Sequence, residues 1–338
     1  MKNIIMKKMI CILLALLLSV SFMAGRDTRA EGKALSVVVT IFPIYDWVRE
    51  VLGDCPNAEI TMLMDSGVDL HSYQPTAQDI LNISSADLFI YVGGESDGWV
   101  EGVLALAANP DLKAISLVEA LGDDIRTEEI VEGMEHEDEH TAGEGNHDED
   151  HDEEGHEHTE VDEHIWLSLR CAQKLVHVIE DTLSSVDPAH AEAFRINASA
   201  YIEKLADLDA RYTETVAGAE IRTVLFGDRF PFSYLANDYG LTYYAAFSGC
   251  SAESEASFQT ILFLARKVDE LDLPAVMTIE HPKTRIADTV VETTAAKDQK
   301  ILAMDSMQSI TARDILSGVT YLSIMESNLD VLREALTR

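Results

Sequence analysis

Two histidines in loop segments have acidic neighbours, a pattern typical of sites for divalent metal cations. His71 lies in the turn-rich segment 65–75, and His164 directly follows Asp162 and Glu163 at the expected start of a helix. Imidazole nitrogens and carboxylate oxygens are ligands that first-row divalent cations take in proteins. A lone histidine in a loop is more often a hydrogen-bonded surface residue, so a metal site needs further ligands elsewhere in the chain.

Carboxylates that could complete such a site occur in the second half of the chain. Asp228 and Asp305 each follow a short apolar run that is typical of a buried strand. Either aspartate could instead cap the helix that comes next, because aspartate is a favoured N-cap residue. Two imidazoles and two carboxylates make a normal four-ligand set for a divalent cation. Glu280, which closes a third apolar run, is the reserve for the fourth ligand.

A site of this kind raises the question of catalysis. A zinc hydrolase needs an open coordination position and a carboxylate base beside the bound water. The histidines at 156 and 158 flank Glu157, but low-complexity sequence offers no rigid frame to position them. A secreted zinc-dependent hydrolase is therefore an alternative only, and an adhesion or metal-buffering protein is a third class.

The acidity of the chain is concentrated in one segment. The 338 residues have a formal charge of −35, which excludes a simple nucleic-acid binder because such proteins need a basic face. Residues 123–163 hold 20 acidic residues and one basic residue, and almost no large apolar ones near their middle. This composition predicts a disordered, solvated loop. We expect its histidines to collect Zn²⁺ weakly, the alternative being a plain spacer: His136, His140, His147, His151, His156 and His158.

The pattern outside this loop predicts an α/β fold with two lobes. Short β-branched runs alternate with amphipathic stretches, which indicates parallel sheets covered by helices. We expect an N-terminal lobe over 31–186, a connecting helix over 187–218 that begins at Asp187, and a C-terminal lobe over 219–338. Such sheets bind ligands at the carboxyl ends of their strands, so the ligand should lie in the cleft between the lobes. The expected strands are 35–41, 60–64, 88–92, 114–117, 223–226, 241–247, 275–279 and 301–304.

The first 30 residues have the layout of a secretory signal peptide. Three lysines precede the uncharged run 9–25, and Ala30 ends an acceptable cleavage site. The uncharged run is at the short limit for a membrane-spanning anchor. Cys11 does not end a convincing lipobox, so no lipid anchor is predicted. The protein is therefore expected in the periplasm or on the extracellular face of the cell membrane.

Three cysteines remain beyond the expected signal peptide. Cys55, Cys171 and Cys250 form no Cys-x-x-Cys pair, which argues against a structural zinc ribbon or a thioredoxin-like site. Packing as small apolar residues is the simplest interpretation of each. The sequence leaves open whether any two of them form a disulfide.

Several segments resemble a known family, the metal-binding solute-binding lipoproteins and periplasmic proteins of ABC transporters for zinc and manganese. Residues 67–75 resemble that family's Gly-x-Asp-x-His-x-Tyr-x-Pro segment, which places a ligand at His71. Residues 162–167 are similar to its Asp-Pro-His-x-Trp-Leu motif, which places a second ligand at His164. Residues 42–46 resemble its opening strand-to-helix turn. The resemblance covers nearly all of the chain after the expected signal peptide.

The resemblance implies a receptor and not an enzyme. It implies capture of a divalent metal ion, above all Zn²⁺, and its delivery to the membrane permease of an ABC transporter for high-affinity import. The protein would be a monomer that contacts the membrane only through the permease. A manganese-binding receptor of the same family is the alternative, because two histidines with two carboxylates are similar to the Mn²⁺ branch.

The sequence departs from the zinc branch at the third histidine. The zinc branch has this histidine five residues before an aromatic residue that Tyr234 matches here. That count falls on Arg229, which cannot ligate a cation. Asp228 fits instead if one residue is inserted around Pro231. The segment around Asp305 resembles the Thr-Asp-Ser segment of the manganese branch, whereas a His-rich acidic loop is a feature of the zinc branch.

Overall fold

The structure is a computed structural model that describes residues 34–134, 160–251, 255–280 and 285–338. The expected signal peptide and the six histidines of the acidic segment lie outside the described residues. All five candidate ligands named from the sequence, two histidines and three carboxylates, lie within them.

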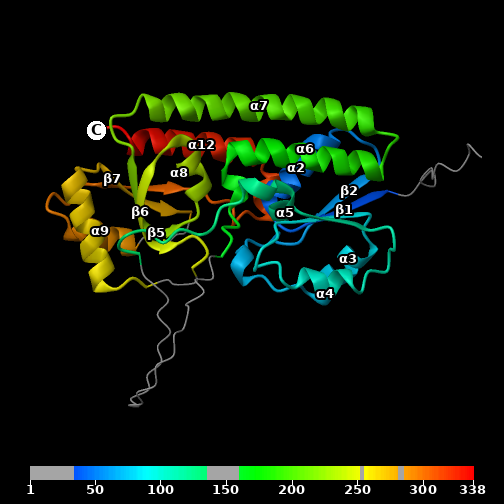
Figure 1. Cartoon of the computed structure of the whole chain (residues 1–338), viewed down its shortest axis with the longest axis horizontal. Helices are drawn as coiled ribbons and strands as arrows, with labels where there is room; N and C mark the ends of the chain where they lie inside the picture. Colours follow the sequence, from blue (N-terminus) through cyan, green and yellow to red (C-terminus); the bar gives the residue numbers. More distant parts are fainter. Residues whose placement is uncertain (1–33, 135–159, 252–254, 281–284) are drawn as a thin grey trace, which may run out of the picture.

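Each lobe contains a four-stranded parallel sheet, which confirms the predicted two-lobed α/β fold (Figure 1). The first sheet has the order β2-β1-β3-β4 and the second the order β6-β5-β7-β8. The inner strands β1, β3 and β7 are short, largely buried apolar runs, as expected of strands covered on both faces, whereas β2, β4 and β8 at the edges are partly exposed. Their strands are β1 (Leu35–Val39), β2 (Ala58–Met62), β3 (Leu88–Tyr91), β4 (Lys113–Ser116), β5 (Thr223–Phe230), β6 (Thr242–Ser248), β7 (Ala275–Ile279) and β8 (Lys300–Met304).

Strand β5 extends four residues beyond its predicted end. Its pairing with β6 shifts register between Phe226 and Arg229. Gly227 lies within the shift, where an added Cβ would lie 2.6 Å from the Cα of Ala287. The close approach of helix α10 thus requires glycine, and the strand continues past it. As a result Asp228 lies inside β5 and not beyond its end.

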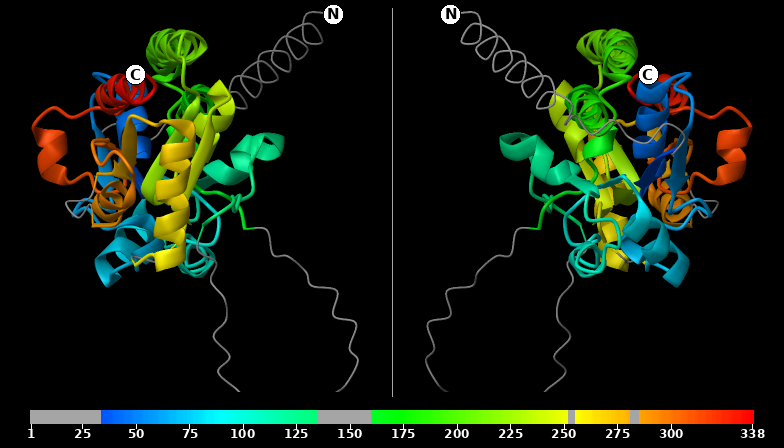
Figure 2. Two further views of the ribbon diagram at one scale, coloured as in Figure 1. Left: turned by 90° about the vertical axis from the view of Figure 1, so that its left-hand side faces the viewer. Right: turned by 90° about the vertical axis from the view of Figure 1, so that its right-hand side faces the viewer.

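Helices cover both sheets and join the lobes (Figures 1 and 2). The first lobe contains α2 (Phe42–Leu52), α3 (Ala77–Ser85), α4 (Val100–Leu104) and α5 (Leu117–Leu121). The second contains α8 (Ser233–Tyr239), α9 (Phe258–Leu271), α10 (Arg285–Thr293), α11 (Ala312–Leu316) and α12 (Tyr321–Ala335). Between them in the sequence lie α6 (Leu169–Val186) and α7 (Ala191–Ala217). Short 3₁₀ turns are η1 (Leu70–Ser72), η2 (Gly122–Asp124) and η3 (Ile165–Leu167).

Helix α7 runs along the length of the molecule, over α6 in one lobe and α12 in the other (Figure 1). Its 27 residues correspond to about 40 Å of helix. Apolar side chains recur at helical spacing on its buried face. These are Phe194, Ala198, Tyr201, Leu205, Leu208, Tyr212 and Val216.

The expectation that Asp187 caps this long helix is wrong. Asp187 instead ends α6, where its backbone N–H donates to the carbonyl of Leu183. Pro188 disfavours a helical conformation for the residue before it, so α6 stops there. The carboxylate of Asp187 accepts a hydrogen bond from Nδ1 of His190 at 2.7 Å, and α7 begins at the residue after His190.

The two ends of the acidic segment are ordered, contrary to the expectation of a loop that is unfolded throughout 123–163. Glu128 N–H donates to the carbonyl of Glu160, and Asp162 N–H donates to that of Arg126. Met134 is buried against the core. The part of the segment with most of the charge lies outside the described residues. The two described ends of the segment are hydrogen-bonded to each other and fix the chain that leads into His164.

A buried carboxylate links α2 to α12. Oδ2 of Asp46 accepts a hydrogen bond from the backbone N–H of Tyr321 at 2.9 Å, and Oδ1 pairs with Arg49 at 2.5 Å. Burial raises the pKa of Asp46 to about 6, whereas an aspartate in an unfolded chain has a pKa of about 3.9. The folded protein therefore binds more protons at this residue than the unfolded chain does between about pH 4 and 6.

We expect Asp46→Asn to remove the pH-dependent stabilisation that protonation of Asp46 gives the folded protein. Protonation of Asp46 stabilises the wild-type protein as the pH falls from 7 to 5, by about 1 kcal/mol, and the amide cannot titrate. Urea unfolding of both metal-free proteins at the two pH values measures the effect. The free energy of unfolding of the variant, relative to wild type, should be lower at pH 5 than at pH 7. An equal difference at both pH values would contradict the assignment.

Candidate metal centre

His71 is held by a tight turn at the edge of the first lobe. It lies in η1, whose N-cap Asp69 accepts a hydrogen bond from the His71 backbone N–H at 3.0 Å. Gly67, earlier in the same segment, has a φ of +75°, and a Cβ there would lie 2.9 Å from the carbonyl oxygen of Ser309. Glycine thus allows this turn to contact the second lobe.

His164 is fully buried before η3. One carboxylate oxygen of Asp162 accepts hydrogen bonds from two groups of His164, the backbone N–H at 3.0 Å and the ring Nδ1 at 2.9 Å. The other oxygen accepts from the hydroxyl of Ser233. Burial alone would raise the pKa of Asp162, but these hydrogen bonds hold it below its ordinary value. A proton fixed on Nδ1 leaves the lone pair of Nε2 for a cation.

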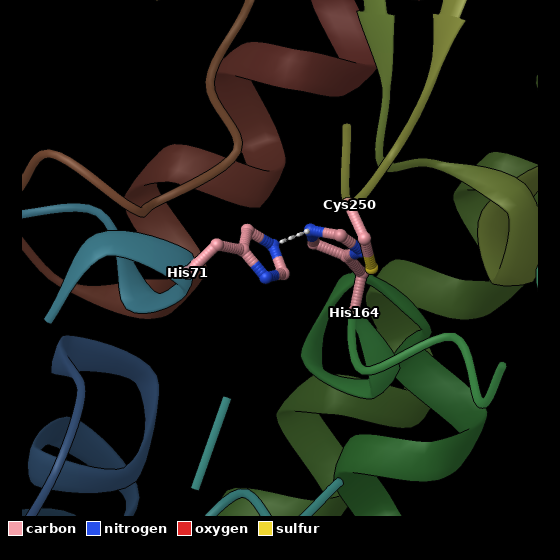
Figure 3. Close-up of side chains that lie close together, drawn as sticks. All are labelled: His71, His164 and Cys250. Atoms are coloured by element: carbon pink, nitrogen blue, oxygen red, sulfur yellow. Dashed lines mark hydrogen bonds between the residues drawn. The ribbon is translucent and has the colours of Figure 1, made fainter. Parts of the chain in front are cut away.

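The imidazole rings of His71 and His164 contact each other at the boundary between the two lobes. Nε2 of His71 lies 3.2 Å from Nε2 of His164, and the dashed line in Figure 3 marks this contact. Burial, together with the neighbouring His164 ring, lowers the pKa of His71 to about 4. The His71 ring is thus neutral near pH 7, the form in which imidazole binds a metal.

The hydrogen bonds assign the proton of each ring in the metal-free protein. Since His164 donates through Nδ1, its Nε2 accepts, and His71 must donate through Nε2. Nδ1 of His71 then accepts from the hydroxyl of Ser96 at 2.9 Å. A cation bound by both Nε2 atoms would shift the His71 proton to Nδ1. The Oε2 atom of Glu163 could then accept a hydrogen bond from this N–H: this buried oxygen lies 3.6 Å from Nδ1 and has no hydrogen-bond partner among the described residues.

A sulfur atom that the sequence analysis assigned to packing lies at the same place. Cys250 Sγ and one ring nitrogen of each histidine all lie within 4.8 Å of one another (Figure 3). Cys250 follows the end of β6 by two residues, and this position beyond a strand end was the only signal in the sequence. Burial raises the pKa of its thiol, so the sulfur keeps its proton in the metal-free protein. No disulfide joins the cysteines of the described ranges.

The predicted carboxylate ligands are not part of this cluster among the described residues. The carboxylate of Asp228 accepts from the backbone N–H of Arg229 at 2.8 Å and from that of Ile279 at 3.4 Å. Glu280 accepts from the N–H and the hydroxyl of Ser306, both at 2.7 Å. Their role as ligands stays a prediction.

Asp305 lies in the loop that follows β8. Its carboxylate accepts from the backbone N–H of Met307 at 2.7 Å. Burial and the negative charge of Glu280 raise the pKa of Asp305 to about 7. The same loop reaches the histidines through Gln308, whose Nε2 lies 3.4 Å from Nε2 of His164. The loop that follows β8 thus contacts the centre through Gln308, and the ligand role of Asp305 also stays a prediction.

Arg229, at the place where the zinc branch has a third histidine, has a structural role. Its guanidinium donates to the carboxylate of Asp69 at 2.8 Å, across the boundary between the lobes. Burial would raise the pKa of Asp69, but the Arg229 charge holds it below its ordinary value. Because Asp69 also caps the turn of His71, Arg229 positions that histidine.

Two stretches have the spacing of hydrolase motifs. Residues 136–140 read His-Glu-x-x-His and lie outside the described residues. Residues 94–98 read Gly-x-Ser-x-Gly, and their serine is Ser96. This serine lies midway in the connection from β3 to α4 and not on a sharp strand-to-helix turn. The ring of His71 beside it has its other nitrogen against His164, so the arrangement lacks the orienting carboxylate of a catalytic triad.

The fold and this centre define a two-lobed, metal-binding solute-binding protein. The model of the family described as zinc-uptake complex component A, periplasmic (ZnuA), matches residues 37–335. The chain belongs to this family, whose members are transport components and not enzymes.

Relatives with names agree with this assignment. The chain is 34% identical over 328 residues to the zinc-binding lipoprotein AdcA of Streptococcus pneumoniae, covering 97% of this chain and 61% of AdcA. It thus spans about three fifths of that relative. It is 30% identical to the high-affinity zinc uptake system protein ZnuA of Bacillus subtilis, covering 91% of this chain and 89% of that protein.

Solved structures have the same fold. The Zn(II)-bound ZnuA-like domain of S. pneumoniae AdcA aligns with a TM-score of 0.68 at 29% identity, covering 90% of this chain and all of that domain. The metal-dependent lipoprotein YcdH of B. subtilis aligns with a TM-score of 0.70 at 26% identity, covering 89% of this chain and 99% of the YcdH chain. Among the residues described for the present chain, none of the helices has the length and apolar character needed to cross a membrane.

We expect Asp162→Asn to weaken metal binding. The amide cannot accept from His164 Nδ1 and its backbone N–H with the strength of a carboxylate, so the ring loses its fixed proton position. The loss should be about 10- to 100-fold in zinc affinity, measured by competition with a chromogenic chelator. Asp187→Asn is the matched control, because it alters an equivalent aspartate–histidine pair at the far end of α6. Equal affinities of the two variants would contradict the role of Asp162.

Proposed function

We propose that the protein is an extracytoplasmic receptor that captures Zn²⁺ and delivers it to an ABC permease for import. The observation that carries the proposal is the pair of Nε2 atoms 3.2 Å apart, one on a partly buried histidine and one on a fully buried histidine. Membership of the zinc-uptake family and the names of the relatives AdcA and ZnuA support zinc as the cargo.

Capture begins when the hydrated ion reaches the two imidazoles and exchanges waters for their Nε2 atoms. Asp162 holds the His164 ring in the required orientation. His71 changes tautomer: it releases the proton of Nε2 and takes one on Nδ1, and this N–H donates a hydrogen bond to the Ser96 hydroxyl or the Glu163 carboxylate. The acidic surroundings favour a cation over an anion at this place.

The second lobe supplies the remaining ligands in this proposal. The loop with Asp305 lies beside the centre, because Gln308 contacts His164. The Oε1 atom of Gln308 is buried and has no hydrogen-bond partner among the residues that the structure describes. We propose that a shift of this loop brings the carboxylate of Asp305 to the cation, with Glu280 as the reserve. Asp228 is the weaker candidate, because its carboxylate accepts hydrogen bonds from backbone groups of β5 and β7.

Release to the permease involves local movements more than a wide opening of the lobes. Helix α7 packs on α6 and α2 of the first lobe and on α12 of the second, and a continuous helix resists bending. A turn such as η1, which consists of three residues, moves at lower cost. The protein acts as a monomer, is exported by its first 30 residues, and meets the membrane through the permease.

The alternatives are not favoured. A manganese receptor of this fold is compatible with two histidines and two carboxylates, but the named relatives are a zinc-binding lipoprotein and a zinc uptake protein. A secreted hydrolase would need a catalytic base on an ordered frame, and the family is one of transport components.

Replacing both central histidines should abolish tight zinc binding. We expect His71→Ala with His164→Ala to reduce affinity by roughly 1,000-fold or more, because no imidazole ligand remains at the centre. The control variant carries His177→Ala with His190→Ala, which removes two histidines of other acidic clusters. Competitive titration with a chelator measures both. Tight binding retained in the first variant would refute the proposed site.

Deleting residues 135–158 should remove weak zinc sites and leave the tight one. The deletion starts after Met134 because that side chain is buried in the fold. Isothermal titration of zinc into both proteins should show the same first, tight equivalent and fewer weak equivalents in the shortened protein. An unchanged number of weak sites would show that the acidic segment is only a spacer.

A further inference from the structure

We propose that the sulfur of Cys250 is a protein ligand of the captured cation, and that its thiolate makes the centre select Zn²⁺ over Mn²⁺. This inference rests on the proposed function, because it names the ligand and the selectivity of the same centre.

The position of Cys250 relative to the histidines carries the inference. Its Sγ and a nitrogen of each ring all lie within 4.8 Å of one another. A tetrahedral zinc site holds such nitrogen and sulfur atoms roughly 3.3 to 3.7 Å apart. Closing the three ligands around an ion therefore takes a movement of about an ångström. His71 comes from the first lobe and Cys250 from the second, so the ion would connect the lobes.

The backbone before Cys250 is pressed against His164. At Gly249 an added Cβ would lie 3.1 Å from ring atoms of His164 and 3.0 Å from the carbonyl oxygen of Phe230. A larger residue would push the chain away from the ring. Glycine at this position therefore brings the next side chain, that of Cys250, to the metal centre.

A second contact fixes the cysteine from the other side. The backbone N–H of Cys250 donates to the carboxylate of Glu128 at 2.8 Å. Glu128 belongs to the ordered end of the acidic segment, where its own N–H donates to the carbonyl of Glu160. The chain that leads into His164 and the loop that carries Cys250 are thus tied together, which fixes their separation.

Two other side chains that the second lobe places at this boundary, Arg229 and Asp228, have different partners. Arg229 pairs with Asp69 and carries a positive charge that repels cations. Asp228 is turned toward the backbone of β7. Among the described histidine, cysteine, aspartate and glutamate side chains of the second lobe, Cys250 is the one that lies in a cluster with both imidazoles.

Ligation by Cys250 needs no redox step. The S–H bond breaks, its proton passes to solvent, and the electron pair left on sulfur forms the bond to the cation. A thiolate is a soft ligand that suits zinc and cadmium, whereas manganese prefers carboxylate and water oxygens. Sulfur at this position thus strengthens the preference that two imidazoles already have for zinc over manganese.

Cobalt(II) is the probe for sulfur ligation. One equivalent added to the reduced, metal-free protein should give a near-ultraviolet charge-transfer band from sulfur to cobalt, and Cys250→Ser should abolish it. The matched control is Cys55→Ser, because Cys55 lies in another possible cluster with Asp187 and His190. Loss of the band in the control, its survival in Cys250→Ser, or its absence from wild type would each overturn the inference.

Selectivity is measured by competitive titration of Zn²⁺ and Mn²⁺. Cys250→Ser should bind zinc at least tenfold more weakly and show a smaller ratio of zinc to manganese affinity. Cys250→Ala and circular dichroism separate loss of the ligand from loss of the fold. An unchanged ratio overturns the inference. If wild type binds zinc tightly without sulfur ligation, only this inference fails; if it binds no zinc tightly, the proposed function fails.

Discussion

The buried carboxylate of Asp162 is the interaction on which the metal centre depends. A single oxygen accepts from both the backbone and the ring of His164, and the other accepts from Ser233 at the start of α8. Its own carbonyl accepts from the hydroxyl of Tyr234 at 3.0 Å. Without these bonds a buried charge would be costly, and the His164 ring would have no fixed proton. One residue thus sets the ring's orientation, its proton and its link to the second lobe.

Polar contacts between the lobes surround this centre. Arg229 pairs with Asp69, and Trp166 Nε1 donates to the carbonyl of Ser306 at 2.9 Å. Asp46 accepts from the first residue of α12. These contacts, together with α7, hold the lobes at one separation. A centre whose ligands come from both lobes needs this, because an error of an ångström is large compared with a metal–ligand bond.

The sequence was most informative where the pattern is local. All eight strands lie at or near their predicted positions. The inner ones were the clearest, because a parallel strand buried on both faces is a short apolar run whatever its partners. His71 and His164 stood out because each lies in a short segment of fixed spacing. The end of α6 was misassigned because Asp and Pro together suit the start of one helix as well as the stop of another.

The sequence by itself thus determined the two parallel sheets, the long helix between them and the histidines that the structure brings together. Only the tertiary structure decided which side chain of the second lobe joins them. Cys250 lies 86 positions from His164 in the chain, and apart from its position beyond a strand end nothing in its local pattern distinguishes it from a packing residue. Its place follows from the close approach of Gly249 to the His164 ring and from the bond to Glu128. Contacts of this kind depend on how the lobes pack, and no local period in the sequence reports them.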